Sequence, residues 1–132
     1  MTLHLDTHAV IWLYAGERSR FPARALAALD HARLVYSPVV ALELTFLHEI
    51  GRIKMGSLPI LDYLRDRIGL VADDTPFLVV VRAAESLTWT RDPFDRMITA
   101  SASAGDHPLL TSDKRIRSNY REAVWDDAPH HA

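Results

Sequence analysis

Cysteine is absent from all 132 residues. Disulfides, iron–sulfur clusters and zinc sites built on cysteine are therefore excluded. Long apolar runs are missing too, since no run, including the one at 77–81, approaches the roughly 20 residues that span a bilayer. The first residues, MTLHLD, show no basic stretch ahead of an apolar one, so we predict no signal peptide. Together these absences lead us to expect a cytoplasmic protein.

The chain also lacks an excess of positive charge. Its 15 lysines and arginines are outnumbered by 17 acidic residues, which gives a formal net charge of −2. An overall basic nucleic-acid binder is therefore not indicated, although a local basic patch is enough for binding. Hydrophobic residues make up 48% of the chain, as in a globular protein with one buried core. We predict a single domain over residues 1–128, followed by a polar tail at 129–132.

Short apolar strands alternate with helices along the chain. Ser37, Thr75 and Asp92 are each followed by proline, which is a strong helix-start signal. Residues 77–81 have the propensity of a strand, but the preceding cap favours a helix. The pattern predicts strands at 3–5, 34–36, 70–71, 108–111 and 123–125, and helices from 7 to 14, 22 to 29, 38 to 47, 58 to 68, 77 to 84, 92 to about 104 and 113 to 120.

This alternation predicts an α/β fold, with a parallel sheet covered by helices on both faces. Ligands of such sheets bind where the strands end at their carboxyl edge. Asp6 and Asp113 each follow a predicted strand, Asp95 lies in the first turn of a helix, and Glu43 lies within a helix among apolar neighbours. Four acids can therefore meet at one edge.

Each acid also has a structural explanation. Asp6 and Asp113 could cap the helices that follow them, and Asp95 together with Asp92 suits the positive end of a helix. Glu43 could reach solvent from the margin of its apolar stripe, although a buried carboxylate is costly unless it is paired or binds metal. If the four converge, their oxygen-only donor set suits Mg²⁺ or Mn²⁺, and such an ion could activate water against a phosphodiester.

Four segments of the chain resemble the motifs of VapC-type PIN domains, and they occur in the order found in that family. They are LDTHAVIW at 5–12, SP at 37–38 leading to EL at 43–44, DPFDRMI at 92–98, and LLTSD at 109–113. The resemblance spans nearly the whole chain. It implies a PIN-like three-layer α/β/α sandwich with a short central parallel sheet, in which residues 77–84 are helical.

The resemblance further implies a Mg²⁺- or Mn²⁺-dependent endoribonuclease that is the toxin of a VapBC-like toxin–antitoxin pair. In it, Asp6, Glu43, Asp95 and Asp113 would be the catalytic and metal-binding acids, with Thr111 and Asp92 supporting them. A VapB-like antitoxin and a second copy of the chain would be its protein partners. The alternatives within the family are RNA processing, and a non-catalytic module that binds RNA or protein.

Basic residues crowd around the third and fourth acids, and they could contact RNA phosphates or form a solvated face. They are Arg91, Arg96, Lys114, Arg115 and Arg117. Aromatic residues could stack on bases, although core or dimer packing is the simpler explanation. They are Trp12, Tyr14, Trp89 and Trp125.

Two phosphotransfer folds compete with this interpretation. A receiver domain needs neighbouring acids at its first strand, and Asp6 has none. A haloacid-dehalogenase-like phosphatase needs Asp-x-Asp there, and the third position is His8. Both fit poorly.

Overall fold

In the computed structural model, which describes residues 1–126, five parallel strands form one sheet in the order β3-β2-β1-β4-β5. The strands are β1 (Thr2–Leu5), β2 (Arg33–Tyr36), β3 (Val71–Ala72), β4 (Leu109–Leu110) and β5 (Ala123–Val124). In β1 and β4, Leu3, Leu5, Leu109 and Leu110 are completely buried. Central strands of a parallel sheet are covered on both faces, which explains these apolar runs.

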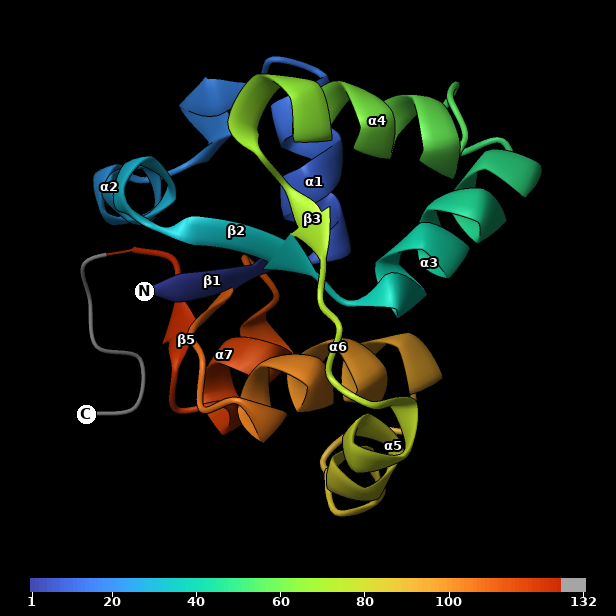
Figure 1. Cartoon of the computed structure of the whole chain (residues 1–132), viewed down its shortest axis with the longest axis vertical. Helices are drawn as coiled ribbons and strands as arrows, with labels where there is room; N and C mark the ends of the chain where they lie inside the picture. Colours follow the sequence, from blue (N-terminus) through green and yellow to red (C-terminus); the bar gives the residue numbers. More distant parts are fainter. Residues whose placement is uncertain (127–132) are drawn as a thin grey trace.

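Helices cover both faces of the sheet, as Figure 1 shows. One face carries α1 (Thr7–Tyr14), α2 (Ala23–His31) and α4 (Ser57–Ile68), and the other carries α6 (Pro93–Ala104) and α7 (Lys114–Asn119). Helix α3 (Pro38–Glu49) extends from the carboxyl end of β2, and α5 (Phe77–Glu85) packs on the outside of α6. This is the predicted α/β sandwich.

The N-terminal ends of the helices show which of the predicted capping residues were correct. Ser37 accepts a hydrogen bond from the Val39 N–H at the start of α3, as its cap position predicted. Thr75 does not cap α5: its hydroxyl donates to Asp73, and Pro76 occupies the N-cap position. The prediction of a cap at Thr75 was therefore wrong, because the helix begins one residue later than that cap requires.

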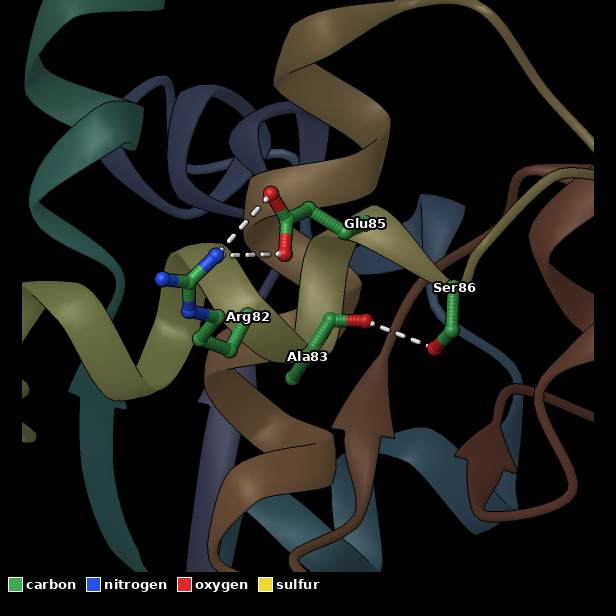
Figure 2. Close-up of polar contacts among 4 residues, drawn as sticks. All are labelled: Arg82, Ala83, Glu85 and Ser86. Atoms are coloured by element: carbon green, nitrogen blue, oxygen red, sulfur yellow. Dashed lines mark hydrogen bonds and ion pairs between the residues drawn. The ribbon is translucent and has the colours of Figure 1, made fainter.

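Residues 77–85 form a helix despite their valine-rich start. Val80 and Ala84 are buried against α6, whereas Phe77 is 75% exposed, so the apolar residues follow helical spacing rather than alternation. Figure 2 shows the last turn, where Arg82 pairs with Glu85 and the Ser86 hydroxyl donates to the Ala83 carbonyl. These polar contacts end the helix.

Other differences from the sequence prediction are small. The third strand lies one residue later than expected, and a 3-10 turn at Arg18–Arg20 was not predicted. The tail predicted at 129–132 lies outside the described residues. Among those described, no helix has both the length and the apolar character needed to cross a membrane.

Candidate active site

Asp6 lies directly beyond β1 and caps α1, so its position serves two purposes. One carboxylate oxygen accepts from the Thr7 N–H at 2.6 Å, and the other accepts from the Thr111 hydroxyl at 2.5 Å. The side chain is almost fully buried, which raises its pKa, and the two hydrogen bonds oppose that shift. Thr111, predicted as a supporting residue, thus holds this carboxylate in place.

Glu43 projects from the middle of α3 toward the start of α1. The Thr7 hydroxyl donates to its Oε1 at 2.5 Å. Partial burial raises the pKa of Glu43, the bond from Thr7 lowers it, and the charge of Asp6 raises it again. The sequence did not single out Thr7, which is fully buried and bridges two of the acids: its N–H binds one and its hydroxyl the other.

Asp92 and Asp95 begin α6 and have different roles there. Asp92 is the N-cap, and one of its oxygens accepts from the backbone N–H groups of Phe94 and Asp95. Asp95 lies three residues further along, at the third position of the helix, and is half-buried. The cap predicted at Asp92 is confirmed.

Asp113 follows β4 and caps α7 by accepting from the Ile116 N–H at 2.9 Å. Its own backbone N–H is bound by the Thr111 hydroxyl at 3.0 Å. Thr111 therefore fixes Asp6 through its proton and Asp113 through its oxygen. The two strand ends are tied together at the carboxyl edge of the sheet.

The pKa of Asp95 responds to the charges of the other four acids. Its pKa is raised to about 7, first by burial and then by the negative charges of Asp92, Asp113, Asp6 and Glu43. Asp95 therefore lies within electrostatic range of the other four carboxyls, although the five residues come from four separate segments. That Asp6, Glu43, Asp95 and Asp113 together bind a metal stays a prediction.

The residues that meet here suit a hard divalent cation in their chemistry. Every candidate ligand is a carboxylate or a hydroxyl. The causes of the raised pKa of Asp95 are burial and negative charges, which a bound cation would offset. Within residues 1–126, no three acids or histidines are arranged as closely as metal ligands would be. Asp6, Asp92 and Asp113 are instead turned toward backbone N–H groups that they cap.

His8 lies near two of the acids, Asp6 and Glu43. It is exposed on the first turn of α1, and its imidazole is close enough to lower the pKa of Asp6 and of Glu43. Its place directly after Asp6 and Thr7 was the only sequence signal for this proximity.

The predicted RNA-contacting residues divide into two groups. Arg91, Arg96 and Arg117 are engaged with the protein: the first two donate to the carbonyls of Thr88 and Thr90, and Arg117 pairs with Asp126 at 2.9 Å. Lys114 and Arg115, by contrast, are exposed on the first turn of α7, directly after Asp113. Arg91 is exposed as well, but of the exposed residues only the second pair directly follows one of the acids.

Comparison with known proteins finds relatives that match most of this chain in sequence. The family model described as PIN domain matches residues 3–122. Ribonuclease VapC22 of Mycobacterium tuberculosis is 31% identical over 121 residues, which cover 89% of this chain and 92% of that protein.

Solved structures share the fold at lower identity. One is VapBC2 from Rickettsia felis bound to a DNA fragment from the promoter, with a TM-score of 0.65, 15% identity, and coverage of 96% of this chain and 100% of that chain. Another is DNA-bound VapBC from Salmonella typhimurium, with a TM-score of 0.62, 19% identity, and coverage of 96% and 98%. At these identities the likeness concerns the fold alone.

Proposed function

This chain belongs to the PIN-domain family, and we propose that it acts as the ribonuclease toxin of a VapBC-like toxin–antitoxin pair, hydrolysing RNA phosphodiester bonds. The observation that carries the proposal is that four other carboxyls lie within electrostatic range of Asp95, near the carboxyl edge of a parallel sheet. A structural role explains a cap at each strand end, but it does not explain why the caps surround a further acid and Glu43.

We assign Asp6, Glu43, Asp95 and Asp113 as the residues that hold the divalent metal, with Asp92 beside them. Nucleases of this family are metal-dependent, and the all-oxygen donor set makes Mg²⁺ or Mn²⁺ the expected ion. When bound, such an ion supplies charge neutralisation at the phosphate and lowers the pKa of water. The carboxylates would keep the ion at the strand ends, where the substrate can reach it.

The remaining residues of the site position these groups. Thr111 orients Asp6 and the backbone of Asp113, and Thr7 holds Glu43. Lys114 and Arg115, exposed next to Asp113, are placed to attract RNA phosphates toward an otherwise acidic site. Positioning by hydrogen bonds of this kind reduces the reorganisation that the reaction requires.

The partners of the related proteins also suggest the partners of this chain. The structural neighbours are VapBC complexes, and we propose a VapB-like antitoxin that restrains this chain, which we expect to be a homodimer. A gene for a small antitoxin next to that of this chain would favour the toxin role over RNA processing.

The test uses the purified chain, free of partners, with total cellular RNA and either Mg²⁺ or Mn²⁺. Cleavage should require the metal and should be lost in EDTA and in the Asp6→Asn variant. Asp74→Asn, which changes an exposed carboxylate outside the acid cluster, is the matched control. Products should end in 5′-phosphate and 3′-hydroxyl groups.

Two results would contradict the proposal. Products with 2′,3′-cyclic phosphates would exclude water as the attacking group. A well-folded chain that neither cleaves RNA nor binds Mn²⁺ would favour the non-catalytic binding module.

A further inference from the structure

An aromatic strip continues from the acid cluster along one side of α1. His8 and Trp12 are one helical turn apart, with ring centroids separated by 5.9 Å. Trp12 also lies 5.9 Å from Trp125, and both tryptophans pack against Phe21. Phe21 is buried, Trp12 and Trp125 are half-buried, and His8 is exposed, so the strip rises from the core to the surface at His8.

The strip lies at the same edge of the sheet as the acids. His8 is two residues after Asp6 and influences the carboxyls of both Asp6 and Glu43. Trp125 directly follows β5, where the Val124 carbonyl accepts from the Thr111 N–H at 3.2 Å. The two ends of the strip are therefore anchored beside the two strand ends that carry acids.

We propose that His8, packed beside Trp12, forms a subsite that receives an unpaired base of the RNA next to the phosphodiester bond that is cut. This inference rests on the proposed function. It gives a role to the exposed imidazole beside the acids, which core packing does not require.

The chemistry favours a nucleobase in single-stranded RNA. Unpaired bases stack on aromatic side chains, including histidine, whereas the carboxylates offer no face on which a base can stack. Because the Trp12 ring lies beside the imidazole, part of the side-chain entropy of His8 is already lost before a base stacks on it. The Arg20 guanidinium lies 5.1 Å from the centre of the Trp12 ring and pairs with Glu17, so it packs along the strip without adding net charge there.

The experiment compares two RNAs that differ only in their bases: labelled octauridylate, and an octamer of abasic ribose phosphates. Binding is measured in EDTA, so that no cleavage occurs, and cleavage of octauridylate is measured in parallel with Mn²⁺. The variants are His8→Ala and His8→Phe. His31→Ala, which removes an exposed histidine on α2, is the matched control.

We expect His8→Ala to bind octauridylate on the order of tenfold more weakly and to bind the abasic octamer like the unchanged chain. His8→Phe should restore the affinity for octauridylate, because it keeps a ring for stacking. His31→Ala should change neither affinity. Since His8 is exposed and alanine favours helices, the variant should stay folded.

Three results would overturn the subsite. If His8→Ala loses the same affinity for both RNAs, His8 contacts the RNA backbone rather than a base. The subsite is also wrong if His8→Ala loses affinity for neither RNA, or if His8→Phe does not restore the affinity for octauridylate. If the unchanged chain cleaves while His8→Ala matches it throughout, only the subsite is wrong. If the unchanged chain neither binds nor cleaves RNA, the nuclease proposal fails with it.

Discussion

Replacing Asp95 by asparagine should stabilise the metal-free protein, although it changes a residue of the proposed site. Asparagine keeps the shape of the side chain and removes a charge that four other acids repel. The first turn of α6 favours a negative charge by about 0.3–1 kcal/mol. The rise in pKa from 3.8 to about 7 shows that burial and repulsion exceed that benefit.

The size of the effect follows from that pKa. A full shift of this extent corresponds to about 4 kcal/mol between the two protonation states. Asp95 is only half-buried, so solvent and salt screen part of the repulsion, and we expect about 1–3 kcal/mol. For a chain of this length, that is a rise in Tm of about 3–10 °C.

The gain depends on pH in a defined direction. Because the pKa of Asp95 is higher in the folded than in the unfolded chain, the folded protein binds the proton more tightly between about pH 4 and pH 7. Its contribution to stability is therefore greatest at low pH, falls through this window, and is constant above it. The difference in Tm between Asp95→Asn and the unchanged chain should grow over the same range.

Thermal unfolding followed by circular dichroism, in EDTA from pH 4.5 to pH 8.5, measures this difference. Asp74→Asn, which alters an exposed acid elsewhere, should show little change. Addition of Mn²⁺ should raise the Tm of the unchanged chain more than that of Asp95→Asn, because a bound ion stabilises only the folded state. A lower Tm for Asp95→Asn in EDTA, or a difference that does not vary with pH, would refute the reasoning.

Two of the three further predictions concern the surroundings of the acids, and one concerns the C-terminal end of α6. Thr111→Val should reduce cleavage at least tenfold and the free energy of unfolding by about 1–3 kcal/mol, because it leaves the Asp6 carboxylate and the Asp113 N–H without this partner. Thr111→Ser should retain most of the cleavage and of the stability. Equal cleavage rates for the two variants would contradict this reasoning. Gly105→Ala would place a Cβ 2.5 Å from the His107 ring, so we expect a loss of about 1–3 kcal/mol by denaturant unfolding, and an unchanged midpoint would contradict it. Reversing the charges of Lys114 and Arg115 to glutamate should weaken RNA binding and reduce its slope against log salt by about 1.4, so an unchanged slope would remove both from the interface.

The fold was predictable wherever one local signal decided an element. Ser37 and Asp92, each followed by proline, begin α3 and α6 as expected. Thr75 failed as a cap although its sequence context is the same, because α5 begins one residue later and Pro76 occupies its N-cap position. Where the helix begins depends on how the chain leaves β3, and a linear pattern does not contain this information.

The candidate site was predictable in its acids but not in the residues that hold them. Thr7 contacts Glu43 across 36 positions of sequence, and Thr111 contacts Asp6 across 105. No local pattern links residues so far apart. Resemblance to a family indicated Thr111, whereas Thr7 became apparent only when the fold brought α1 and α3 together.

For three of the acids, capping and site formation were treated as competing explanations, and the structure shows that they are compatible. In a parallel sheet, the residue that follows a strand starts the next helix and also lies at the carboxyl edge. Asp6 and Asp113 occupy such positions, and Asp92 caps a helix that begins beside them. Capping therefore brings carboxylates to one place without additional structure. Glu43 caps nothing, and it comes from the middle of a helix to the same point. Glu43 is therefore the acid that helix capping alone cannot explain, and it provides the stronger argument that the cluster exists to bind a cation.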